Sequence, residues 1–445
     1  SVSPASVAWC LSSLHPPYLT SIYTPIYAQK IENASKYLAS IAQLNNDQNN
    51  LKPRNKVENA HSIPVLLYHG ITKNRDRFSL TADDFRSQMF ALKKAGYETI
   101  TTADFYDFLT GKKNLPDRSF LLTFDDGRTD SYIGADPLLK ALGYKAVMFT
   151  VTSDSLPESG RASDYYLNKR ALQTMADSGR WEIQSHGKQE SHNEKIPSGF
   201  VQIDPNGKKG NFLSNRMWLQ DQNRLESPEE YRERVDDELA GSKRILQTAF
   251  HAPVAAFAYP FGDYGQQSLN NRQSSKKIIA EKITENYKLA FRQVWDADNE
   301  YSFNYKYDNP FTAKRIESAA DWTAEELLFV LESREAKPLP YSDLFAKNSG
   351  WKKEWGLVSL KDDFMVLGAH ISTTGSAVFL DGSYLWKDYI FKADVHLIKG
   401  QVFSLTARYK DGENYAACTF SDKSARAEQI INGEKKVLSQ LKGDF

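Results

Sequence analysis

The sequence has few cysteines, no long apolar run and no excess of either charge, and each shortage excludes a class of protein. Of 445 residues only Cys10 and Cys418 are cysteines, too few for a disulfide framework or a cysteine-type zinc site. No stretch approaches the roughly 18 apolar residues of a membrane-spanning helix. Lys+Arg and Asp+Glu number 56 each, so no basic excess indicates nucleic acid or an anionic membrane surface as a partner. A chain of this length is expected to form two or three globular domains.

Residues 1–62 are expected to be an N-terminal helix and linker region. Residues 1–29 mix Pro, Ser and Tyr with short apolar stretches. They are only weakly typical of a processed export segment, because prolines interrupt the apolar part. A short helix is predicted over 30–44, followed by an Asn-rich linker.

The region 63–340 alternates short apolar strands with helical stretches. Strands are predicted at 63–68, 119–124, 144–151, 181–184, 255–259, 289–291 and 313–316, and helices at 81–95, 102–110, 131–142, 169–178, 274–285 and 322–334. A further helix should begin at Ser227-Pro228-Glu229-Glu230, which has an N-cap serine, proline at the first helical position and glutamate two residues later. This order predicts an α/β fold with a mainly parallel sheet, and its length suits a βα barrel, complete or incomplete.

The last part of the chain, residues 351–445, has an all-β pattern. Alternating segments at 355–360, 377–380, 389–397, 402–409 and 415–420 are separated by Asp-Gly turns. They predict a smaller, jelly-roll-like β-sandwich, which is short enough to be a fragment of a larger one. The aromatic residues Trp351, Trp355, Tyr384 and Trp386 either stack on sugars or fill core and interdomain space, and the second interpretation is favoured for most of them.

Two carboxylates follow one of the buried strands directly, in Thr123-Phe124-Asp125-Asp126-Gly127. In a βα barrel, catalytic residues collect at this carboxyl end of the strands. Adjacent carboxylates are costly to bury unless a metal or a proton-transfer role accounts for them. The alternative is a simple Asp-Gly turn.

Residues that could bind a metal or a substrate also follow two further predicted strands. His186 follows the strand at 181–184, and His192 lies six residues later in a polar loop. Neutral imidazoles with a carboxylate form a typical open site for a catalytic divalent metal, although both could be solvated loop histidines. The segment Phe257–Gly262 ends a strand with Tyr-Pro-Phe-Gly, a sharp turn that can present a backbone N–H to a pocket.

These three elements, in this order, resemble the carbohydrate esterase family 4 polysaccharide deacetylases over about residues 63–335. Within that family the chain looks most like the biofilm poly-N-acetylglucosamine deacetylases. Those carry a Tyr-His pair on a strand ahead of the Asp-Asp motif, as Tyr68-His69-Gly70 does here. The long insertion after the second histidine is also similar to that branch.

The resemblance implies a role for each matching residue. Asp125 would be the general base that activates water, and His69 the general acid that protonates the leaving amine. Asp126, His186 and His192 would hold a divalent metal, usually zinc in this family. The spacing of six between the two histidines departs from the four or five usual in the family, which makes the assignment of His192 weaker than that of His186.

The resemblance also implies roles for the third motif. The backbone N–H of Phe261 would help to hold the oxyanion, and Tyr259 and Pro260 would contact the substrate. Many family members have an arginine where this chain has Ala258, so the partner that orients the base must come from elsewhere. Arg315, at the end of a late strand, is the candidate; the alternative is a surface ion pair.

The resemblance implies an enzyme that hydrolyses N-acetyl groups of an amino-sugar polymer. Two alternatives remain: an O-acetyl glycan esterase with the same site, and a non-catalytic carbohydrate-binding protein on the same fold. The expected partner is a polysaccharide, with no nucleic acid and no transmembrane segment. A polymer substrate implies an extracytoplasmic location, in the periplasm, at the cell surface or secreted.

Overall fold

The computed structural model describes residues 59–158, 163–190, 196–267, 269–272, 274–294, 300–361, 363–369 and 375–443. The predicted helix at 30–44 and His192 lie outside these residues. No helix in the described part of the chain is both long and apolar enough to cross a membrane.

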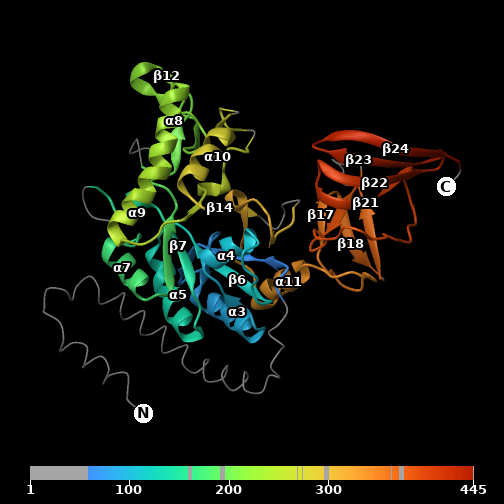
Figure 1. Ribbon diagram of the computed structural model, residues 1–445, viewed down its shortest axis with the longest axis horizontal. Coiled ribbons are helices and arrows are strands. Elements are labelled where there is room, and N and C mark those ends of the chain that lie inside the picture. Colours follow the sequence, from blue (N-terminus) through green and yellow to red (C-terminus); the bar gives the residue numbers. More distant parts are fainter. Residues whose placement is uncertain are drawn as a thin grey trace, which may run out of the picture.

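A closed barrel of seven parallel strands forms the centre of the molecule (Figure 1). The strands follow one another around the barrel in the order β2-β16-β14-β13-β8-β7-β6, and β6 pairs with β2 to close it. Their bounds are β2 Val65–Tyr68, β6 Ser119–Phe124, β7 Ala146–Thr150, β8 Trp181–Ser185, β13 Ala256–Ala258, β14 Leu289–Val294 and β16 Ala313–Glu317. A short strand, β5 (Glu98–Thr99), adds to β6 outside the ring. The predicted α/β barrel is confirmed.

Helices surround the barrel and begin and end where local chemistry dictates. Their bounds are α3 Ala82–Lys94, α4 Thr102–Leu109, α5 Thr129–Leu142, α6 Thr152–Ser155, α7 Lys169–Asp177, α8 Pro228–Asp236, α9 Ser242–Phe250, α10 Ser275–Asn286 and α11 Ala324–Arg334. The predicted start at Ser227 is confirmed, because its side chain accepts from the backbone of Glu230, whose carboxylate bonds back. Helix α5 ends at Gly143, which adopts the left-handed conformation with φ 68°.

Alternation along the strands divides the core into two parts. One set of side chains fills the barrel interior, and α4 packs against it through Phe105 and Phe108. The opposite set packs against the outer helices. Because side chains alternate with a period of two, Leu121, Thr123 and Asp125 point to the same side, which brings Asp125 to the end of the interior.

The C-terminal strands lie to one side of the barrel (Figure 1) in three antiparallel sheets. The pairs are β17 Trp351–Trp355 with β20 Ala377–Leu380 and β18 Leu357–Lys361 with β19 Phe364–Gly368, and the third sheet is β21 Val402–Asp411, β22 Asn414–Ser421, β23 Ser424–Ile431 and β24 Glu434–Lys442. The strand predicted at 389–397 was wrong, since this segment is irregular. Alternation specifies two faces but not a hydrogen-bonding partner, and no described strand pairs with it.

The aromatic residues of this region mostly serve the contact with the barrel. Tyr384 stacks on Tyr305 with ring centroids 4.6 Å apart, and the indole N–H of Trp386 donates to the Lys337 carbonyl at 2.6 Å. Trp355, by contrast, is 47% exposed. The interdomain interpretation therefore holds for Tyr384 and Trp386.

Candidate active site

Asp125 and Arg315 form a bidentate ion pair inside the barrel. The two guanidinium nitrogens of Arg315 donate to the two carboxylate oxygens of Asp125 at 2.6 and 2.7 Å. The side chains are 0% and 1% exposed, which excludes a surface ion pair. The guanidinium also lies over the rings of Phe149 and Phe291, at 5.2 and 6.0 Å from their centroids. Arg315 is thus fixed on both sides and holds the carboxylate of Asp125 in one orientation.

The electrostatics of this pair keep Asp125 ionised. Burial alone would raise the pKa of Asp125, but the Arg315 guanidinium, with smaller contributions from His186 and His69, outweighs burial and holds the pKa below 3.8. A charged, oriented carboxylate at the end of the barrel interior can accept a proton from water.

Asp126 and His186 come together beside this pair. Nε2 of His186 lies 3.6 Å from the Asp126 carboxylate and 3.8 Å from that of Asp125. Nδ1 of His186 is 2.9 Å from the Ala258 carbonyl, which can only accept, so Nδ1 carries a proton, and in the neutral imidazole Nε2 keeps its lone pair. This is the arrangement of a metal-binding histidine, whose second nitrogen donates to a carbonyl. Asp126 and His186 therefore fit a divalent metal ion.

A third protein ligand is not found among the described residues. Within them, no three His, Cys, Asp or Glu side chains gather closely enough to hold a metal. The predicted third ligand, His192, lies outside the described residues, so its assignment stays a prediction.

His69 follows β2 at the same end of the barrel, and Glu317 at the end of β16 faces it. Nδ1 of His69 lies 3.3 Å from the Glu317 carboxylate, and both side chains are largely buried. Burial alone would lower the pKa of His69, but Glu317 and the charges of Asp126 and Asp125 outweigh it and raise the pKa above 6.5. The sequence analysis missed Glu317. Its position two residues after Arg315 on one strand was the available signal, because such residues share a side.

A second missed residue, Glu238, holds the loop that follows His186. Its carboxylate accepts from the backbone N–H groups of Lys188 and Gln189, the latter at 3.1 Å. Gly187 must be glycine, since an added Cβ would meet the Glu238 carboxylate at 2.2 Å. Glu238 lies in a single π-helical turn (Asp237–Gly241) between α8 and α9, a distortion often found at functional sites.

The Tyr-Pro-Phe-Gly turn follows β13 and forms another side of the site. Tyr259 is 2% exposed, and its hydroxyl donates to the Phe311 carbonyl, so a substrate contact by Tyr259 would need its backbone. Pro260 is also buried, whereas Phe261 is 45% exposed and adopts a left-handed φ of 58°. The N–H groups of Gly262 and Asp263 bond back within the turn.

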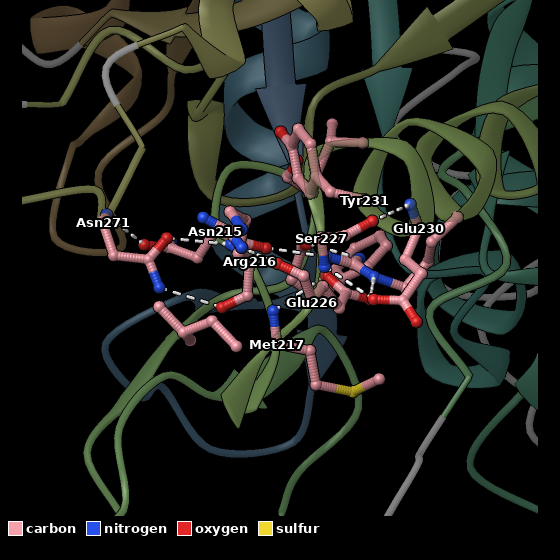
Figure 2. Close-up of polar contacts among 12 residues, drawn as sticks. Asn215, Arg216, Met217, Glu226, Ser227, Glu230, Tyr231 and Asn271 are labelled. Atoms are coloured by element: carbon pink, nitrogen blue, oxygen red, sulfur yellow. Dashed lines mark hydrogen bonds and ion pairs between the residues drawn. The ribbon is translucent and has the colours of Figure 1, made fainter. Parts of the chain in front are cut away.

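The insertion between β8 and β13 is tied to this turn by polar contacts. Asn211 donates to the buried carboxylate of Asp263 at 2.8 Å, and the ring of Phe200 packs on Phe261 with centroids 4.7 Å apart. Asn271, eight residues past Asp263, accepts from the backbone of Arg216 and donates back to it, as Figure 2 shows.

Glu226 holds the insertion itself together (Figure 2). Its carboxylate accepts from the Met217 N–H at 2.8 Å and from Arg234 at 2.7 Å. Arg234 also donates to the carbonyls of Phe212 and Asn215. These contacts hold the described part of the insertion next to the Phe261 turn.

Comparisons with known proteins show what the region around this site is similar to. Residues 112–277 match the family model described as polysaccharide deacetylase, a stretch that contains Asp125, Asp126, His186 and Phe261. YxkH of Bacillus subtilis, whose name marks it as an unproven polysaccharide deacetylase, is 27% identical over 214 residues, 48% of this chain and 62% of that protein. The poly-beta-1,6-N-acetyl-D-glucosamine N-deacetylase of Escherichia coli K12 is 26% identical over 194 residues, 42% of this chain and 28% of that protein.

The chain thus spans less than two thirds of the length of these two relatives. A solved de-N-acetylase structure from Aggregatibacter actinomycetemcomitans has a TM-score of 0.48 and 20% identity, and covers 60% of this chain and 98% of that one. Residues 112–277 of the chain are thus similar to the polysaccharide deacetylase family.

Proposed function

We propose that the protein is a metal-dependent enzyme that removes N-acetyl groups from a poly-N-acetylglucosamine-like polymer outside the cytoplasm. The observation that carries the proposal is the buried pair of Asp125 and Arg315 next to Asp126 and His186. The family match and the relatives named as poly-N-acetylglucosamine deacetylases support the substrate class. Action on an exopolysaccharide in turn supports an extracytoplasmic location.

The residues divide the proposed reaction among them. Asp126 and His186, with His192 as the predicted third ligand, would hold the metal, most simply zinc. When bound, such an ion supplies Lewis acidity to an amide carbonyl and to water. Asp125, held ionised by Arg315, accepts the proton of the attacking water. The backbone N–H of Phe261 donates to the oxyanion as it develops.

His69 completes the proposed reaction on the opposite side of the substrate amide. An amine leaves well only when it is protonated. Glu317 and the nearby aspartates raise the pKa of His69 above its usual value, which favours the protonated imidazole. His69 can therefore donate that proton to the leaving nitrogen.

Acetate release from β-1,6-linked N-acetylglucosamine oligomers tests the proposal. Asp125→Asn should lower kcat by about 10²- to 10⁴-fold, the usual size of a general-base contribution. Asp83→Asn, an exposed carboxylate on α3, is the matched control and should release acetate at the native rate. Chelation should abolish release, and zinc or another divalent ion should restore it.

Other outcomes would redirect the proposal. Release from acetylated xylan but from no N-acetylated oligomer would favour the O-acetyl esterase. A protein that binds oligomers and releases no acetate with any divalent ion would be a carbohydrate-binding protein on this fold.

A further inference from the structure

An exposed tyrosine, Tyr165, lies on a segment that is hydrogen-bonded to the loop that carries the Asp-Asp motif. The Thr129 N–H donates to the Tyr165 carbonyl at 2.9 Å, and the Leu167 N–H donates to the Gly127 carbonyl at 2.8 Å. Arg128 and Tyr166 form an antiparallel bridge between these bonds. Tyr165 therefore lies on a segment that is hydrogen-bonded on both sides of Arg128 to the loop of the Asp-Asp motif.

The ring of Tyr165 rests on a buried cation. Its centroid lies 4.9 Å from the Arg128 guanidinium, and the ring of Tyr166 meets it edge-on at 4.8 Å. Arg128 is 8% exposed and is itself fixed by two bonds to Asp130, at 3.0 and 2.6 Å. The ring is thus held in one orientation before any ligand arrives, which lowers the entropy cost of binding.

Arg128 also ties this segment to the strand that follows His69. A Cβ added at Gly70 would meet the guanidinium of Arg128 at 2.3 Å and the hydroxyl of Ser79 at 2.4 Å. The chain after His69, the Asp-Asp loop and the Tyr165 segment consequently meet at one cation.

Tyr165 is partly open to solvent beside the loop that carries Asp125 and Asp126. The residue is 49% exposed, although the guanidinium covers one face of its ring. Burial raises the pKa of the Tyr165 phenol, Arg128 lowers it, and the nearby Asp126 carboxylate raises it further. The Asp126 side chain, on the loop to which the Tyr165 segment is hydrogen-bonded, is itself 35% exposed.

We infer that Tyr165 is a stacking platform for a hexosamine ring adjacent to the residue that loses its acetyl group. This inference rests on the proposed function. A rigid aromatic face beside a polar site is the surface that the apolar C–H face of a pyranose ring packs against. Tyr165 would select a polymer over an isolated acetylated sugar, because only a polymer places a second ring there.

The test compares a long substrate with a small one. Tyr165→Ala is expected to raise KM for N-acetylglucosamine pentamers by about 3- to 10-fold, the value of one aromatic stacking contact, with a smaller effect on kcat. Tyr165→Phe keeps the ring and should restore the native KM. The selectivity for pentamer over 4-nitrophenyl acetate, an ester that contains no sugar ring, should fall by the same factor in Tyr165→Ala.

Tyr307→Ala serves as the matched control. Tyr307 is 79% exposed and precedes β16, so it lies at the amino-terminal end of the barrel, opposite the site. This variant should keep the native KM for both substrates. If Tyr165→Ala lost activity equally on the pentamer and on the ester, Tyr165 would have a structural role and the platform would be overturned. An unchanged KM for the pentamer would overturn it as well.

Calorimetry of pentamer binding separates this inference from the proposed function. Pentamer binding that weakens in Tyr165→Ala would support the platform even if the native protein released no acetate, in which case only the proposed function fails. Acetate release with identical pentamer affinity in the native protein and Tyr165→Ala would leave the proposed function standing and remove the platform.

Discussion

Two buried aspartates in this chain both lie near cations, and their pKa values are shifted in opposite directions. Asp125 in the barrel contacts Arg315 directly through two hydrogen bonds. Asp381, where the C-terminal strands meet the barrel, instead accepts from the N–H and hydroxyl of Ser302 at 3.3 and 3.0 Å. The cations Arg334 and Lys352 also reach the Ser302 hydroxyl, at 3.2 and 3.4 Å.

The difference in contact accounts for the opposite pKa shifts. Burial raises the pKa of Asp381 above 3.8, and Lys352 and Arg334 offset this only in part. At Asp125 the bidentate guanidinium outweighs burial, and the pKa falls below 3.8. Burial near cations is therefore not enough to lower the pKa of a carboxylate, whereas direct pairing with Arg315 lowers it at Asp125.

The largest effect is expected from removing the direct pair. Arg315→Met should lower the free energy of unfolding by about 3–5 kcal/mol, because it leaves the Asp125 charge buried without a partner. Acetate release should fall with it, since Asp125 loses its orientation. Denaturant unfolding and kcat measure the two effects.

Arg334→Met provides the comparison at the second cluster. This variant should lower the free energy of unfolding by about 1–3 kcal/mol, the cost of a disrupted buried hydrogen bond, and leave kcat at the native value. Equal losses of activity in both variants would contradict the distinction between the two clusters.

A similar loss of activity, without the loss of stability, is expected at His69. His69→Gln should lower kcat by about 10²- to 10⁴-fold if His69 is the acid that protonates the leaving amine. Glu317 is the partner of His69, and Glu317→Gln keeps the shape of this side chain but removes its charge. This variant should lower kcat by about 10-fold and shift the basic limb of the pH profile to lower pH. An unchanged profile would argue that Glu317 does not act through His69.

An intermediate effect is expected from Glu238, which acts through the loop after His186. Glu238→Leu removes the acceptor for the N–H groups of Lys188 and Gln189 and should weaken zinc binding by about 10- to 100-fold. Glu238→Gln keeps an acceptor oxygen and should bind zinc more tightly than the leucine variant. Equal zinc affinity in the two variants, measured by competition with a chelator, would contradict this role.

The smallest effect concerns the pH dependence of stability at Asp381. Because folding raises the pKa of Asp381 above 3.8, its contribution to stability is greatest below that pH and falls as the pH rises through the folded pKa. The stability of the native protein relative to Asp381→Asn should therefore decrease as the pH rises above 3.8.

The stability of the native protein relative to Asp343→Asn should depend on pH with the opposite sign. Burial raises the pKa of Asp343, but hydrogen bonds from the Phe345 backbone and from Trp351 and Tyr341 outweigh it and lower the pKa below 3.8. The contribution of Asp343 is present above 3.8 and disappears as the pH falls through the folded pKa. Denaturant titrations at pH values both below and above 3.8 give both slopes, and parallel slopes would contradict the comparison.

The sequence by itself determined the local structure and the strand ends. Alternation between helical and apolar segments specified the barrel, and capping residues such as Ser227 specified where helices begin. The positions of Asp125, Asp126, His186 and His69 after strands predicted that they would meet, because parallel strands all end at one edge.

Only the tertiary structure decided which side chains pair. Asp125 and Arg315 are 190 positions apart, and β2 is the neighbour of both β6 and β16 only because the barrel closes. Closure likewise sets Glu317 against His69, and the π-helical turn sets Glu238 under the loop after His186. Patterns in a sequence report the face of an element on which a residue lies; its partner depends on register and closure, which are properties of the whole sheet.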